Sequence, residues 1–155
     1  MFSQTVEYAL RATVHLAIHA ESPQRTAAIA ESTKVPLAYL SKILQGLQRG
    51  QIVHLQRGIG GGVKLALSPD RLTVLDVVNA VDPIKRIKSC PLNLMSHGPN
   101  LCELHRRLDD SMLSIEESLG TTTLSELMKK SNPSPAICED AEVTKNDSAF
   151  VPIRG

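Results

Sequence analysis

Aromatic residues are scarce in this sequence, which has two Phe, two Tyr and no Trp among 155 residues. The hydrophobic fraction of 42% is enough for a folded domain, so its core must be aliphatic. No apolar run approaches the roughly 20 residues that a membrane-spanning helix needs, and no basic segment followed by an apolar run opens the chain. We therefore expect a cytoplasmic protein without a membrane partner, built as one domain with appendages.

Cysteine is also rare, with three residues in the chain: Cys90, Cys102 and Cys138. An odd number argues against a disulfide framework and leaves metal binding or redox chemistry as options. Cys138 stands apart in residues 131–155, a segment of Ser, Pro, Asn, Asp and Glu without periodicity that we interpret as a disordered tail. We treat Cys138 as incidental.

Charge is small in total but unevenly distributed. Residues 1–67 carry seven Lys and Arg against three Asp and Glu, a net of +4, whereas residues 68–155 carry ten against thirteen, a net of −3, which gives the total of +1. Lys and Arg release counterions from a phosphate backbone, so the basic half favours a nucleic-acid partner for the N-terminal part.

An amphipathic helix is predicted between Pro36 and Gly50, residue types suited to helix entry and exit. Its apolar stripe repeats at intervals of three and four residues: Leu37, Leu40, Ile43, Leu44 and Leu47. Outside the stripe lie Tyr39, Ser41, Lys42, Gln45 and Arg49. This polar and basic face indicates a DNA-reading helix, with Tyr39, Ser41, Lys42 and Gln45 as the candidate major-groove contacts.

Two short strands, residues 52–56 and 63–67, are predicted around the sequence RGIGGG, whose glycines supply the positive φ angles of a tight hairpin. Arg57 before the turn and Lys64 after it can approach phosphates or a minor groove. The glycines could instead form a nucleotide-binding loop, but the terminal Lys-Ser/Thr is missing and a strand follows. A hairpin turn without further function is the remaining alternative.

Further helices are predicted over residues 4–20, 25–32 and about 73–81, with Ser3 as the first N-cap. Glu7 and Arg11 lie one turn apart in the first helix, where the simplest interpretation is an exposed ion pair. Together these elements predict a mainly α fold with a small β-hairpin wing, a winged helix-turn-helix DNA-binding domain over residues 1–83.

A longer helix is expected over residues 101–119, opened by a capping box of Asn100 and Glu103 and ended by Gly120. Its apolar positions form a narrow, nearly heptad seam: Leu101, Leu104 or His105, Leu108, Met112, Ile115 and Leu119. Such a seam needs a partner, so residues 101–130, which include a short following helix, are interpreted as a dimerisation unit. The resulting homodimer would bind two successive half-sites of DNA.

Cys90, Cys102 and His105 form the pattern C-x11-C-x2-H. Cys102 and His105 share one face of a helical turn, and the loop of residues 84–100 can fold Cys90 over them, a ligand set suited to zinc or an iron–sulfur cluster. The alternatives are simple packing, or a thiol nucleophile with a histidine base. The enzyme alternative is disfavoured because no third orienting group or polar substrate pocket accompanies them.

Over about residues 1–130 the chain resembles the IscR and NsrR family of bacterial winged-helix regulators. The resemblance lies in the segments VEYALRA, YLSKILQGLQRGQIVHLQRGIGGGVKLA and LTVLDVV and in the placement of the Cys90, Cys102 and His105 triplet. It implies a homodimeric DNA-binding transcription factor, usually a repressor, whose operator affinity is set by an iron–sulfur cluster that senses iron, redox state or nitric oxide.

One departure from the family pattern concerns the cluster ligands. Ser96 stands where three-cysteine members have their middle cysteine. A two-cysteine branch of the family binds a [2Fe–2S] cluster rather than a [4Fe–4S] cluster. It completes the ligand set with a glutamate and a histidine from the first helix of the other subunit. In this sequence Glu7 matches the glutamate, but Arg11 replaces the histidine. The resemblance therefore implies Cys90, Cys102, His105 and the other subunit's Glu7 as ligands. A fourth ligand from Ser96, His97 or water, a zinc site, and a cluster-free regulator remain alternatives.

Overall fold

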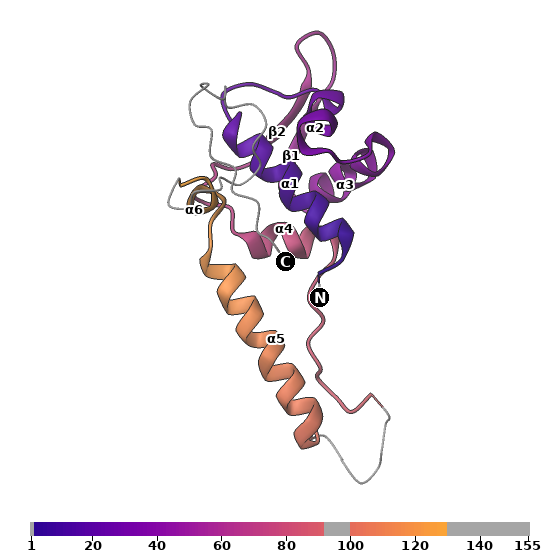
Figure 1. Ribbon diagram of the computed structural model, residues 1–155, viewed down its shortest axis with the longest axis vertical. Coiled ribbons are helices and arrows are strands. Elements are labelled where there is room, and N and C mark those ends of the chain that lie inside the picture. The colour runs from indigo at the N-terminus through magenta and orange to yellow at the C-terminus, as the bar shows by residue number, and fades with distance from the viewer. Residues whose placement is uncertain (1, 92–99, 130–155) are drawn as a thin grey trace, which may run out of the picture.

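The computed structural model describes residues 2–91 and 100–129. The elements in chain order are α1 (Gln4–Ile18), α2 (Thr26–Thr33), α3 (Leu37–Arg49), β1 (Val53–Gln56), β2 (Gly62–Leu65), α4 (Val74–Val81), α5 (Glu103–Thr121) and α6 (Leu124–Met128) (Figure 1). This is the mainly α fold with a two-stranded hairpin that the sequence predicts. Ser96, His97, Cys138 and the expected tail lie outside the described residues.

Local sequence signals set most of the helix ends. The Val6 amide donates to the Ser3 hydroxyl, which caps α1 as expected. Helix α3 begins directly after Pro36 and ends before Gly50. A capping box joins Thr73 and Asp76 at the start of α4: the hydroxyl accepts from the Asp76 amide at 3.1 Å, and the carboxylate accepts from the Thr73 amide at 2.8 Å.

The core lies where α1 packs against α2, α3, α4 and α6. Its largest fully buried side chains are Leu16, Ile29, Leu40, Leu44, Leu47, Leu72, Leu124, Val6, Val53, Val63, Val77 and Val78. No aromatic side chain is buried within the described ranges, so the expectation of an aliphatic core is confirmed there. This core holds α3 in place from one side and leaves its opposite face in solvent.

The two strands pair antiparallel with Val53 opposite Leu65 and His54 opposite Lys64. The wing is joined to the body by Gln24 and Val63, whose amides donate to each other's carbonyls at 2.9 and 2.8 Å. At Gly62 an added Cβ would lie 2.7 Å from the Gln24 carbonyl oxygen. Glycine is therefore needed there for the wing to join the body.

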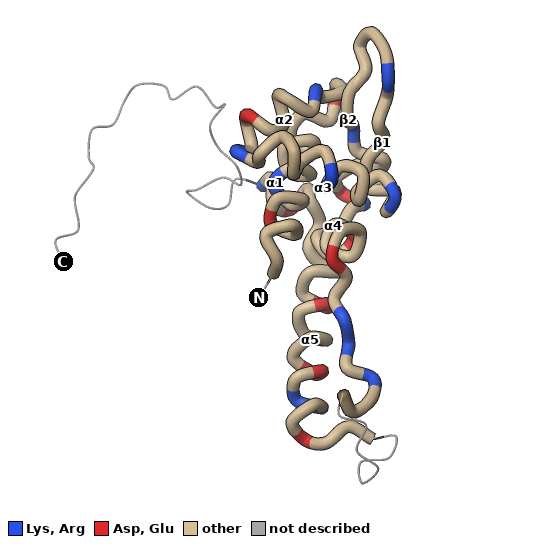
Figure 2. Tube along the Cα trace, turned by 90° about the vertical axis from the view of Figure 1, so that its right-hand side faces the viewer, with Lys and Arg blue, Asp and Glu red and all other residues tan. Residues whose placement is uncertain are grey.

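Helix α5 projects from the winged-helix body as a stalk (Figure 1). After α4 the chain runs outward beside α5, which then leads back to the body, where the Leu124 amide donates to the Leu72 carbonyl at 2.9 Å. Figure 2 shows basic residues of the outgoing segment next to acidic residues of α5.

In the described part of the chain, no helix has the length and apolar character that crossing a membrane requires.

Three expectations about helices are wrong in detail. Leu37 is 52% exposed rather than part of the buried stripe, because a side chain in the first helical turn extends past the N-terminal end of the packed surface. Cys102, not Asn100, is the N-cap residue of α5, and Glu103 pairs with arginines instead of closing a capping box. Gly120 lies inside α5, which ends at Thr121.

Candidate functional site

The polar face of α3 is exposed as the sequence predicts. Helix α3 buries Leu40, Ile43, Leu44 and Leu47 on one side. Its other side presents Tyr39, Ser41, Lys42 and Gln45 to solvent. The ring of Tyr39, which is 59% exposed, meets Tyr8 of α1 edge to face at a centroid distance of 6.4 Å. This contact orients the aromatic ring at the start of the exposed face while its hydroxyl remains available to a ligand.

The wing supplies two more exposed cations, Arg57 and Lys64. Neither has an ion-pair partner within residues 2–91 and 100–129, so both charges are available to an anionic ligand. Gly58 and Gly60 have φ angles of 99° and 77°, which favour glycine and turn the chain sharply at the tip. Between them the side chain of Ile59 is fully exposed. The sequence interpretation did not single out Ile59, although the glycines on both sides of it were a signal.

The metal-ligand candidates are only partly brought together. The Sγ atom of Cys102 lies 3.2 Å from Nδ1 of His105, at the outer end of α5. Cys90 follows α4 in the outgoing segment and is 5% exposed. The described residues contain no group of three or more His, Cys, Asp and Glu side chains close enough to hold a metal ion. Cys102 and His105 are therefore in contact, whereas the described residues do not bring Cys90 into one group of metal-binding side chains with them.

Glu7 lies in α1, whereas Cys102 and His105 lie at the far end of the stalk (Figure 1). Its carboxylate is exposed and forms an ion pair with Arg11, the simplest interpretation from the sequence. Arg11 also donates to the Thr33 carbonyl at 3.3 Å, which ties α1 to α2. A ligand role for Glu7 thus requires a second subunit, and Arg11 would compete for its carboxylate.

The thiol and imidazole of Cys102 and His105 fit an iron–sulfur cluster or zinc by donor type, since both groups are common ligands of these centres. Their contact at 3.2 Å places the two donor atoms close enough to share one metal ion. Next to them, the pKa of Glu103 is held below its usual value by hydrogen bonds from Arg106 and then Arg107. Glu103 is therefore an ionised partner of these arginines beside the pair.

An exposed, polar helix stacked on a helix-turn-helix core, beside a glycine-tipped hairpin, defines the winged-helix class of DNA-binding proteins. Within that class, the chain belongs to the Rrf2 family, described as iron-dependent transcriptional regulators, whose family model matches residues 2–130. It is therefore a transcriptional regulator of a family that binds DNA.

The similarity extends to individual proteins. The regulator IscR of Aliivibrio salmonicida is 34% identical over 122 residues, which cover 78% of this chain and 73% of that protein. The solved structure of T. potens IscR has a TM-score of 0.70 at 24% identity and covers 85% of this chain and 88% of that one. That of CymR, the global cysteine regulator of B. subtilis, has a TM-score of 0.67 at 24% identity, with coverages of 82% and 95%. At this identity both structures support the fold alone.

The family and these relatives are transcriptional regulators and not enzymes. The interpretation of Cys90 or Cys102 as a catalytic nucleophile is therefore rejected. The same comparisons support the winged-helix interpretation of the RGIGGG hairpin over a nucleotide-binding loop.

Proposed function

We propose that the protein is a homodimeric transcriptional regulator, acting as a repressor, whose affinity for operator DNA is controlled by an iron–sulfur cluster. The observation that carries this proposal is the contact of Cys102 with His105 at 3.2 Å, a thiol and an imidazole held on one helical turn in an iron-dependent family. The likeness to IscR of Aliivibrio salmonicida adds support from a named regulator.

DNA binding is assigned to α3 and the wing. Tyr39, Ser41, Lys42 and Gln45 occupy the exposed face of α3, which would lie in the major groove. Arg57 and Lys64 would bind phosphates or the adjacent minor groove, because they are exposed cations without an ion-pair partner in the described part of the chain.

Dimerisation is assigned to α5. Within the single chain this helix has no buried residue, and Leu104, Leu108 and Ile115 are 65%, 46% and 43% exposed. Three large apolar side chains along one stalk are unfavourable in water, and a second copy of the helix would cover them. A two-fold pair of stalks would also place two DNA-reading helices for two half-sites.

The cluster is assigned to Cys90, Cys102, His105 and Glu7 of the partner subunit, with [2Fe–2S] as the type. When bound, the cluster would supply a centre that reacts with oxidants or nitric oxide or is lost when iron is scarce. The chain's own residues would transmit that change: ligation joins the start of α5 to the first helix of the other subunit, so gain or loss of the bond alters the angle between the two wings.

Anaerobic purification followed by an absorption spectrum and iron and sulfide counts tests the cluster. We expect a coloured protein with equal iron and sulfide, and operator binding in a mobility-shift assay that differs between the loaded and apo forms. Cys90→Ala and Cys102→Ala should each abolish the colour. A colourless parent with bound zinc would instead favour the zinc-binding regulator, which the same pair of donor atoms could support.

A further inference from the structure

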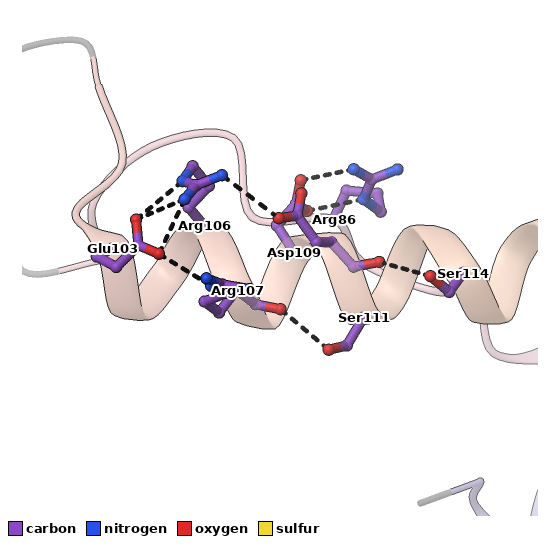
Figure 3. Close-up of polar contacts among 8 residues, drawn as sticks. Arg86, Glu103, Arg106, Arg107, Asp109, Ser111 and Ser114 are labelled. Atoms are coloured by element: carbon purple, nitrogen blue, oxygen red, sulfur yellow. Dashed lines mark hydrogen bonds and ion pairs between the residues drawn. The ribbon is translucent and has the colours of Figure 1, made fainter.

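The segment that leads from the DNA-binding domain to Cys90 is fastened to α5 by one arginine. Arg86 donates from Nε to Oδ1 of Asp109 at 2.7 Å and from Nη2 to Oδ2 at 2.5 Å, a two-point fork, and from Nη1 to Glu116 at 3.2 Å. The Ile87 amide donates to the same Asp109 Oδ1 at 2.8 Å. Figure 3 shows the fork between Arg86 and Asp109.

These contacts differ from the other ion pairs of α5. The side chains of Arg86, Asp109 and Glu116 are 26%, 16% and 25% exposed, and the pairs join residues 23 and 30 positions apart. The pairs formed by Arg106 with Glu103 and Asp110 are local, with every side chain more than half exposed. A mostly buried two-point ion pair constrains geometry far more than exposed pairs within one helix, which contribute little.

The residues of the fork are close in sequence to the candidate metal ligands. Asp109 lies one turn after His105 and about two turns after Cys102 on the same helix. Arg86 lies four residues before Cys90, in a segment that is neither helix nor strand. The preceding end of that segment is also fixed, because the Ser3 hydroxyl donates to Asp82 at 2.7 Å. The path to Cys90 is thus attached to both the body and α5.

We infer that Arg86, Asp109 and Glu116 form a latch that holds the segment leading to Cys90 against α5, the helix that begins with the Cys102 and His105 pair. The latch is made by positioning residues and not by ligands. This inference rests on the proposed function and deepens it. The latch restricts the segment before Cys90, so Cys90 loses less conformational freedom when it joins a shared site. It also links the state of that site to the segment that enters the DNA-binding domain.

The first test uses the full-length, reduced apo protein, so that it does not depend on a cluster. Iodoacetamide labelling is followed by peptide-resolved mass spectrometry, which gives the rate at Cys90 relative to Cys102. Arg86→Gln and Asp109→Asn should each raise this ratio about tenfold, because the released segment exposes Cys90 more often. The double variant should match the singles rather than add to them. Unchanged ratios in both single variants would overturn the latch.

Arg71→Gln and Asp110→Asn are controls, because they make the same chemical changes at exposed residues outside the latch. Both should leave the labelling ratio at the parent value. Thermal unfolding of each variant checks its fold. Arg86→Lys is a milder variant, because it keeps the positive charge but cannot form the two-point hydrogen bond. We expect it to give a labelling ratio between those of the parent and Arg86→Gln. If Arg86→Gln does not fold, a labelling ratio in Arg86→Lys equal to the parent's would overturn the latch.

The second test measures the lifetime of the chromophore in the loaded protein under a chelator. Arg86→Gln and Asp109→Asn should shorten it about tenfold, and the control variants should not. Equal lifetimes in coloured parent and latch variants would overturn the positioning of Cys90. A colourless parent would contradict the proposed cluster, whereas the labelling ratio of the apo protein would still decide the latch.

Discussion

Single residues of the proposed DNA-binding face divide into those proposed to contact base edges and those proposed to contact phosphate. Lys42 and Gln45 lie on the exposed face of α3, the helix proposed to enter the major groove. We expect Lys42→Ala or Gln45→Ala to reduce discrimination at one base position by about 1 to 3 kcal/mol. Competition binding with single-base operator variants measures this, and Gln48→Ala near the end of α3 is a control. Unaltered base preference in both variants would exclude this face.

Arg57 is one of the residues proposed to contact phosphate. It is an exposed cation just before the wing tip, so we expect Arg57→Ala to weaken binding to all sequences alike. The slope of log affinity against log salt concentration should fall by about 1, the loss of one phosphate contact. Binding titrations at four salt concentrations measure this, with Arg71→Ala as a control that removes an exposed arginine outside the wing. A loss restricted to one operator sequence would indicate base reading instead.

Residue positions show where sequence pattern was sufficient. The stripe from Leu40 to Leu47 and the exposed face opposite it follow from the helical period, so both were predicted. Leu37 was not, because period alone ignores the direction of a side chain in the first turn. The helix start at Cys102 was also missed, since Asn100 and Glu103 matched a capping pattern whose carboxylate was taken by nearby arginines.

Among the described helices, α4 and α6 each begin with a complete capping box. Thr73 and Asp76 satisfy each other's amides in the capping box and thereby fix the helix that packs on α1. Thr73→Ala should lower the free energy of unfolding by about 1 kcal/mol. Urea unfolding at fixed protein concentration measures this. Thr121→Ala, in the exposed last turn of α5, should change the value by less than about 0.5 kcal/mol; equal effects of both substitutions would contradict the cap.

The segment between α4 and α5 was the least predictable element. Residues 84–100 have no hydrophobic period, and the sequence analysis therefore assigned only a loop with a possible ligand role for Cys90. The fork between Arg86 and Asp109 joins residues 23 positions apart, and a single sequence does not indicate which of several charged side chains will meet. Tertiary geometry, rather than local pattern, determines this part of the candidate site.

At the scale of the whole molecule, the exposed seam of α5 predicts the oligomeric state. Replacing Leu108 and Ile115 with Glu places two charges where a second stalk would pack, so we expect a monomer that binds half-sites poorly. Sedimentation velocity measures this. Ser114→Glu, an exposed change on the same helix, should stay dimeric. A dimeric double variant would mean that these side chains serve the single chain.

The shared ligand site is the prediction that most depends on two subunits. In one chain the α1 body and the outer end of α5 are far apart, so Glu7 can reach Cys102 and His105 only from a partner. Arg11 would compete with the metal for this carboxylate, while its separate bond to the Thr33 carbonyl holds the arginine in place. Glu7→Ala should therefore leave the dimer and its fold intact while shifting the absorption spectrum and shortening the chromophore's lifetime.

Glu31→Ala is the matched control, because it removes an exposed carboxylate from α2 without touching the ligand set. Arg11→Ala separates the two roles of Glu7. If the carboxylate is a ligand, releasing it from Arg11 should lengthen the chromophore's lifetime. If Glu7 and Arg11 form only a structural ion pair, Glu7→Ala and Arg11→Ala should cause the same small loss of folding stability. Spectra, cluster lifetimes and unfolding curves of the four proteins distinguish these outcomes. A Glu7→Ala protein with the parent's spectrum, cluster lifetime and redox behaviour would place all ligands of the cluster within one subunit.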